Sequence, residues 1–140
     1  MPPPLPIRFV VHNLAQTEAA LRAGAEAGAP VIVESPPNAG RYWGAPYFLA
    51  MISAARAAVP DAVFDAILDC GDAPGLAVEA LRQGVHAVRL DVRPDVAASV
   101  ADIAQQLGAR VETESLPPDT LNLNTVRDPL EAARARMARR

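Results

Sequence analysis

Short apolar runs alternate with longer segments of helical periodicity along most of the chain. The runs are rich in Val, Ile and other strand-forming residues and are bounded by Gly, Pro and Asp, as buried strands are. Five strands are expected, at residues 7–12, 30–34, 63–68, 87–90 and 109–114. In the segments between them, apolar positions recur every three or four residues. Four helices are therefore expected, at residues 14–27, 46–59, 74–83 and 94–107.

Strands that alternate with helices of this length pair in parallel through right-handed crossovers. The fold class is therefore α/β, and two architectures fit it: an open doubly wound sheet or part of a (β/α) barrel. A complete eight-stranded barrel usually takes about 200–250 residues, more than this chain has. The segment 121–126 has the pattern of a sixth short strand. Asp128 as N-cap and Pro129 in the first turn then open a C-terminal helix.

The domain organisation is simple. The Pro-rich residues 1–6 are expected to be a flexible lead, because proline cannot donate to a strand ladder. Residues 7–140 are expected to form a single domain. Residues 35–45 read as the longest loop inside it, with two prolines, two glycines and two of the six aromatic side chains.

Composition and charge exclude several classes of function. Half of the residues are hydrophobic (51%), enough to bury a core without disulfides, and the only cysteine, Cys70, fits a reducing, cytoplasmic compartment. A net charge of −3 argues against nucleic acid as a partner, and no apolar run approaches the roughly 20 residues that span a bilayer. All 13 basic residues are arginines, so the chain has no lysine with which to form a Schiff base.

Chemically active side chains follow the strands, where ligands bind in both architectures. This edge carries an imidazole, a hydroxyl, a thiol and several carboxylates, the groups of a metal site or an acid/base site. They are His12, Glu34, Ser35, Asp69, Cys70, Asp72, Asp91, Arg93, Glu112 and Glu114. Several of these residues also have a structural alternative. Asp72 and Asp91 stand at positions where they could be the N-caps of the following helices. Cys70 could be a small buried residue of the core, and His12 could be a surface histidine.

Six segments in order resemble one known family. They are Phe9–Gln16, Pro30–Ser35, Gly40–Gly44 with Phe48–Met51, Ile67–Asp72, Ala80–Asp91 and Gly108–Glu114. Their sequences are similar to consecutive segments of the class II fructose-bisphosphate aldolases, and Leu121–Thr125 looks like a reduced form of a late segment of that family.

The resemblance implies a TIM barrel on which a bound metal acts as Lewis acid and a carboxylate moves a proton. Asp69 then matches the proton-shuttling aspartate, and Cys70 stands where a metal-binding histidine is expected. Glu114, or Glu112, matches an acidic position on the fifth strand. If a metal does bind, the candidate ligands are Cys70 and Glu114 together with His12 from the strand-end edge, and zinc is the candidate metal. Asn122 matches a substrate-binding asparagine, Asn124 and Thr125 a phosphate-contacting stretch, and Ser35 joins the substrate-binding residues.

Departures from the family pattern limit what carries over. Two later metal histidines and the glycine-rich phosphate loops have no counterpart, Val10 replaces an asparagine, and Pro36 falls where a serine is expected. We therefore expect a partial barrel of about five strands that binds no cofactor and has lost aldolase activity. It would bind a small (phospho)sugar-like ligand or act as a structural or regulatory homo-oligomer.

The alternative is a metal-dependent aldehyde-lyase or isomerase whose site is completed by a second subunit. Because the strands read as apolar on both faces, an open barrel would expose an apolar concave side. Either the segment 116–140 folds back, so that its helix plugs that side, or a second copy covers it. We expect a homodimer or a higher even oligomer.

Overall fold

The computed structural model describes residues 5–140, and of the flexible lead expected over residues 1–6, residues 1–4 lie outside the described part. A parallel sheet of six strands is its centre. The strands are β1 (Ile7–Val10), β2 (Val31–Glu34), β3 (Phe64–Asp69), β4 (Ala87–Arg89), β5 (Arg110–Glu112) and β6 (Leu121–Asn122). The five strands expected from the sequence and the short sixth one are all confirmed, with ends shifted by a few residues.

The helices follow the strands in the expected alternation. They are α1 (Leu14–Ala27), α2 (Ala39–Tyr42), α3 (Gly44–Ala58), α4 (Pro74–Arg82), α5 (Pro94–Gln106), the 3-10 turn η1 (Leu123–Thr125) and α6 (Pro129–Ala138). Asn13 caps α1 and Asp128 caps α6, each by accepting a backbone N–H from three residues further on.

The expected loop at residues 35–45 is wrong, because it contains α2 and the start of α3. Asn38 begins the turn in the left-handed region (φ 63°), which asparagine tolerates better than most residues. The buried small residues Ala39 and Gly40 then let α2 pack closely on the end of β3. The sequence did not predict α2, because a single turn between prolines and glycines is too short to show helical periodicity.

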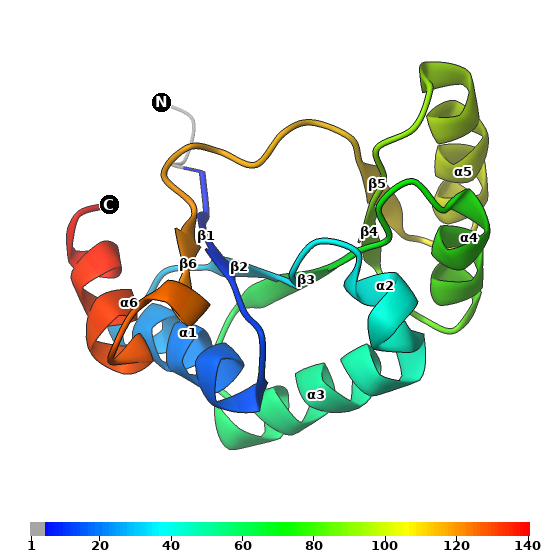
Figure 1. Ribbon diagram of the computed structural model, residues 1–140. Helices are drawn as coiled ribbons and strands as arrows, with labels where there is room; N and C mark the ends of the chain where they lie inside the picture. Colours follow the sequence, from blue (N-terminus) through cyan, green and yellow to red (C-terminus); the bar gives the residue numbers. More distant parts are fainter. Residues whose placement is uncertain (1–4) are drawn as a thin grey trace.

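Strand order decides between the two architectures. The order β5-β4-β3-β2-β1-β6 places each of the first five strands beside its neighbour in the chain, with no reversal of direction. This is the winding of a barrel rather than of a doubly wound sheet. β6 pairs with β1, where the last strand of a closed barrel lies, and the sheet stays open between β5 and β6. Figure 1 shows the helices around the outside of the curved sheet.

The main core lies between the sheet and these helices. Phe9, Val33, Leu68 and Val88 point to the helix side of their strands and are fully buried with Leu21 and Phe48 of the helices. Phe9 and Phe48 are the only fully buried aromatic side chains among them, so aliphatic residues and alanine form most of the core.

The concave face is charged, and the expectation of an apolar concave side is wrong. Arg8 of β1, Glu34 of β2 and Arg89 of β4 all point to this face. Glu34 is 1% exposed, and its carboxylate accepts from Arg8 at 2.9 Å and from Arg89 Nε at 2.5 Å. Next to this group, Arg110 of β5 pairs with Asp65 of β3. The sequence pattern placed Glu34 at the end of its strand but did not show its pairing with Arg8 and Arg89, whose positions alternate with the Val and Phe residues of the other face.

The connection from β5 to β6, residues 113–120, passes across the concave side (Figure 1). Arg89 ties it down by donating to the carbonyl oxygen of Glu114. The last helix does not plug the opening. Instead α6 packs on the outer helix α1, where Arg134 forms two hydrogen bonds with Glu26, at 2.7 and 2.8 Å. Within residues 5–140, no helix is both long and apolar enough to cross a bilayer.

Glu34 gives the first testable prediction. In Glu34→Gln, two nearly buried guanidinium groups lose their counter-charge, so the free energy of unfolding should fall by about 3–5 kcal/mol. Urea unfolding followed by circular dichroism measures the change. The matched control is Glu26→Gln, which breaks the exposed pair with Arg134 and should leave the midpoint nearly unchanged. Equal effects of the two substitutions would contradict a structural role for the Glu34 group.

Candidate functional site

A hollow of about 440 Å³ opens at the carboxyl ends of β3 and β4. Its walls come from α2, from the turn after β3 and from the turn after β4. The lining residues are Pro37, Asn38, Arg41, Tyr42, Asp69, Gly71, Asp72 and Asp91. Three carboxylates face a single guanidinium, so the hollow is acidic and rich in hydrogen-bond acceptors.

Asp69 is the innermost charged residue of this hollow, as the last residue of β3. Its Oδ1 accepts the backbone N–H of Gly71 at 2.8 Å and that of Asn38 at 3.2 Å. Asp69 therefore holds two turns together with one oxygen and leaves the other oxygen without a hydrogen bond among the described residues. The candidate proton-shuttling residue thus lies in the hollow and also shapes it.

Cys70 turns away from the hollow and does not line it. It is 2% exposed, and a Cβ built at Gly40 of α2 would come within 2.9 Å of its Sγ, so the thiol is packed against that helix. Burial, with a smaller contribution from the nearby Asp69 carboxylate, raises the pKa of the Cys70 thiol to about 12. A thiol held in this form is a packing group, whereas a metal ligand must be a thiolate.

Ser35 ends β2 and is also buried. Its Oγ accepts the backbone N–H of Asp69 at 2.9 Å and donates to the carbonyl oxygen of Pro36 at 3.2 Å. The hydroxyl therefore ties the end of β2 to the end of β3, directly behind the hollow. It positions Asp69 through the backbone.

A second group of candidate residues lies where β1 and β6 end. Asn124 accepts a hydrogen bond from Gln16 of α1 at 3.0 Å, Asn122 accepts the backbone N–H of Asn124 at 3.0 Å, and Thr125 donates to the carbonyl oxygen of Asn122 at 2.8 Å. His12 lies at the end of β1, and its Nε2 is buried with no hydrogen-bond partner among residues 5–140. The Gln16–Asn124 hydrogen bond joins η1 to α1, the other two bonds shape the η1 turn, and all of these residues lie outside the hollow at Asp69.

The candidate metal ligands are spread over separate places. Cys70 faces α2, His12 follows β1, and Glu114 is an exposed residue after β5; the alternative, Glu112, hydrogen-bonds Arg110 at 3.2 Å. Within residues 5–140, no three His, Cys, Asp or Glu side chains come close enough together to hold a metal ion. This arrangement does not fit the divalent metal that the family resemblance implies.

The structure gives two residues of the hollow, Asp72 and Asp91, roles that differ from those expected from the sequence. The expected N-cap role of Asp72 is wrong, because Ala73 is the N-cap of α4 and no side chain caps that helix; Asp72 pairs instead with Arg41 at 3.6 Å. Asp91 does not cap α5 either, since Arg93 holds that position. Arg41 was missed because it stands on the unrecognised α2. The signal that could have identified it is its position beside Tyr42 and Trp43 in the segment expected to be the longest loop.

The comparisons with known proteins match this fold. The profile of the family described as "Fructose-bisphosphate aldolase class-II" covers residues 7–115, most of the described chain. The chain is 29% identical over 120 residues to "Fructose-bisphosphate aldolase, plasmid" from Cupriavidus necator, and 28% identical to "Fructose-bisphosphate aldolase" from Xanthobacter flavus over the same length. The protein of that name from Nostoc sp. is 29% identical.

The chain belongs to the class II fructose-bisphosphate aldolase family. The alignments cover 76% of this chain but only 33–35% of the three relatives, so it spans about a third of their length. Both the family profile and the parallel barrel-type winding confirm the resemblance seen in the sequence.

The buried thiol gives a prediction about pH. The pKa of Cys70 is about 12 in the folded protein and near 9.0 when the chain is unfolded. A raised folded pKa means that its stabilisation is fully present below pH 9 and is lost as the pH rises toward 12, by about 1.4 kcal/mol for each pH unit. Urea unfolding of the native chain and of Cys70→Ala at several alkaline pH values measures this. Native stability should fall more steeply than that of the variant, and parallel curves would contradict the assignment.

Proposed function

We propose that the hollow around Asp69 binds a small polyhydroxylated, sugar-like molecule and that this domain by itself does not cleave carbon–carbon bonds. The observation that carries the proposal is the lining of the hollow. Carboxylates of Asp69, Asp72 and Asp91 accept hydrogen bonds from ligand hydroxyls, and the exposed ring of Tyr42 offers a face for the C–H side of a sugar. The volume of about 440 Å³ is adequate for one such molecule.

The charge of the hollow limits how many phosphates the ligand carries. Arg41 is the one cation among the lining residues, and it already faces Asp72 at 3.6 Å. One phosphate group is accommodated by turning toward Arg41. A second phosphate meets the carboxylates and is repelled. The preferred ligand is thus a neutral sugar or a sugar monophosphate, and a bisphosphate is disfavoured.

The absence of aldol cleavage is proposed on the placement of the side chains. Polarising a carbonyl with a bound metal requires several converging ligands, and the candidate ligands Cys70, His12 and Glu114 lie at different strand ends. We propose a ligand-binding or regulatory role in place of catalysis. The free buried thiol supports a reducing compartment such as the cytoplasm.

Titration of the protein with fructose, fructose 6-phosphate and fructose 1,6-bisphosphate tests the proposal. Calorimetry should show the bisphosphate as the weakest ligand of the three. Asp69→Asn keeps the oxygen that accepts from Gly71 and Asn38 but removes the charge, so affinity for fructose should drop about tenfold, or about 1.4 kcal/mol. Arg41→Gln should weaken the monophosphate selectively.

The control for this titration is Asp61→Asn, which changes an exposed carboxylate outside the hollow. It should bind all three sugars like the unchanged protein. Tightest binding of the bisphosphate, unaffected by Asp69→Asn, would refute the proposed site. Metal-dependent cleavage of fructose 1,6-bisphosphate that disappears in Asp69→Ala would refute the non-catalytic role.

Self-association is a second proposal, and the open sheet supports it. Among residues 5–140, β5 pairs with β4 only, so its other edge offers unpaired backbone groups to a further strand. A second copy that adds its own strands there would extend the barrel and bring new side chains to the rim. This is the arrangement in which a metal-dependent aldehyde-lyase or isomerase site would be completed by a second subunit.

Analytical ultracentrifugation tests the association. We expect a dimer or a higher even oligomer at micromolar concentration, and Val111→Pro on β5 should shift it toward monomer by blocking strand addition. The control is Val126→Pro, which removes a backbone N–H outside the sheet. A folded monomer of the unchanged chain across the micromolar range would exclude the proposal.

A further inference from the structure

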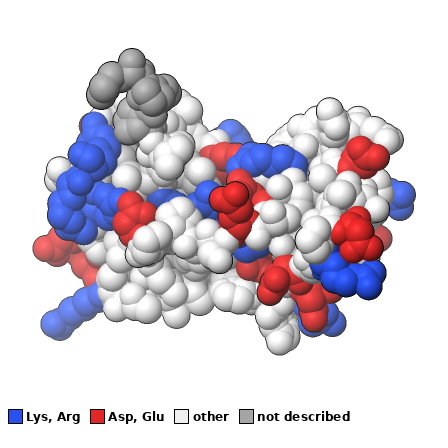
Figure 2. Space-filling view, turned by 90° about the horizontal axis from the view of Figure 1, so that it is seen from above, with Lys and Arg blue, Asp and Glu red and all other residues white. Residues whose placement is uncertain are grey.

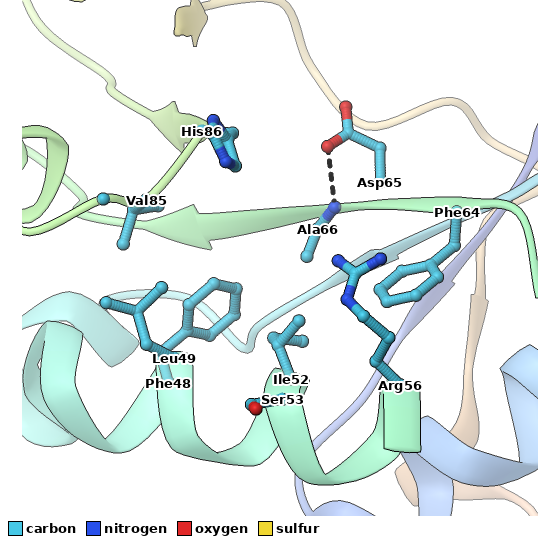
Figure 3. Close-up of a pocket in the computed structure, with 11 residues that line it drawn as sticks. Phe48, Leu49, Ile52, Ser53, Arg56, Phe64, Asp65, Ala66, Val85 and His86 are labelled. Carbon is cyan, nitrogen blue, oxygen red and sulfur yellow. Dashed lines mark hydrogen bonds between the residues drawn. The ribbon is translucent and has the colours of Figure 1, made fainter. Parts of the chain in front are cut away.

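We propose that a second pocket, remote from the strand-end rim, binds a small carboxylic acid with an apolar body. This pocket lies on the helix side of the sheet, between α3 and the amino-terminal ends of β3 and β4 (Figure 3). It encloses about 310 Å³. Asp69 and the hollow above it lie at the opposite ends of the same strands, so the two sites share no lining residue.

The inner wall of the pocket is apolar. Phe48 and Ile52 of α3 and Val85 before β4 are buried, and Leu49, Phe64 and Ala66 are partly buried around them. An apolar group that enters the pocket gains burial against this wall at no cost in hydrogen bonds. The wall thus selects a ligand with a hydrocarbon or aromatic body.

Arg56 supplies the charge at the mouth of the pocket. Its guanidinium lies 4.5 Å from the centroid of the Phe64 ring, and Figure 3 shows the two side chains together at one end of the pocket. This cation–π contact holds the guanidinium over the ring without using its N–H groups, which remain able to donate to a ligand. Among residues 5–140, no carboxylate lies within ion-pair distance of Arg56.

The other ionisable residues of the lining do not neutralise Arg56. The carboxyl group of Asp65 lies on the opposite side of β3 in Figure 3, where it accepts the backbone N–H of Ala66 at 2.9 Å and pairs with Arg110. His86 is exposed in the turn before β4 and brings no negative charge. A cation without an acidic partner therefore stands next to an apolar cavity.

These features together define the ligand as an amphipathic monoanion. A carboxylate matches one guanidinium with two parallel hydrogen bonds, and the hydroxyl of Ser53, one turn before Arg56, can donate a further one. A phosphate dianion needs more hydrogen-bond donors than Arg56 and Ser53 provide at the mouth of the pocket. The apolar body then points inward along Phe48 and Ile52.

Three small molecules distinguish the contribution of the ligand's charge from that of its apolar ring. Phenylacetate carries both the ring and the charge, phenylacetamide has the same shape without charge, and acetate lacks the ring. We expect phenylacetate to bind at millimolar concentration or better, about tenfold more tightly than either of the others, in NMR titrations that follow the shifts of α3 and β4 amides. Failure of phenylacetate to bind, or equal binding of the amide, overturns the proposal.

Two variants and one control assign the binding to this pocket. Arg56→Gln should weaken phenylacetate about tenfold while leaving phenylacetamide unchanged, because only the charged contact is lost. Ser53→Phe places a ring from an exposed helix position into the mouth and should weaken both probes. Arg127→Gln, at an exposed arginine outside the pocket, should change neither.

Thermal unfolding of each variant verifies that it is folded before its affinity is interpreted. If Arg56→Gln does not fold, Arg56→Lys takes its place: it keeps the charge but loses the planar fork, and should weaken phenylacetate by a smaller factor. Affinity for phenylacetate that is the same in the unchanged protein and in Ser53→Phe contradicts the assignment.

Discussion

The carboxylate of Glu34, held between Arg8 and Arg89, is the interaction on which the half-open barrel depends. It joins β1, β2 and β4 across the concave face, and Arg89 carries the connection on to the backbone of the segment that crosses this face. In a closed barrel this space is filled by layers of branched apolar side chains. With a gap between β5 and β6, such layers would lie open to water, whereas paired charges tolerate its approach.

The core between the sheet and the helices is rich in alanine, and these small side chains let the helices pack closely on Phe9, Val33 and Leu68. Figure 2 shows that charged side chains of both signs are spread over the upper face, with a concentration of basic ones at one end of the molecule. Two arginines of α6, Arg134 and Arg136, are paired with Glu26 and Asp119.

The sequence predicts most of the fold because the signals that start and stop its elements are local. Asn13 and Asp128 cap their helices, and Pro74 and Pro94 begin two others. The concave face could not be predicted in the same way. Glu34 meets Arg8 and Arg89 across 26 and 55 residues of chain, so the pairing appears only once strand order and register are known.

The site was predictable in part for a similar reason. Asp69 follows from its place at a strand end, which any parallel fold brings to the rim. The side chains that complete the hollow depend on α2, a single turn whose start requires Asn38 in the left-handed region. The burial of Cys70 also depends on that turn, because Gly40 is the residue that covers the thiol. The unrecognised α2 thus accounts for the missed Arg41 and for the packing of Cys70.

The pairing of β6 with β1 also has a consequence for the order in which the chain folds. Each of β1 to β5 pairs with a neighbour in sequence and can be added as the chain leaves the ribosome. β6 pairs with a strand that was made more than a hundred residues earlier. Until then the outer edge of β1 has no partner, so the pairing with the greatest sequence separation is the one that closes this edge.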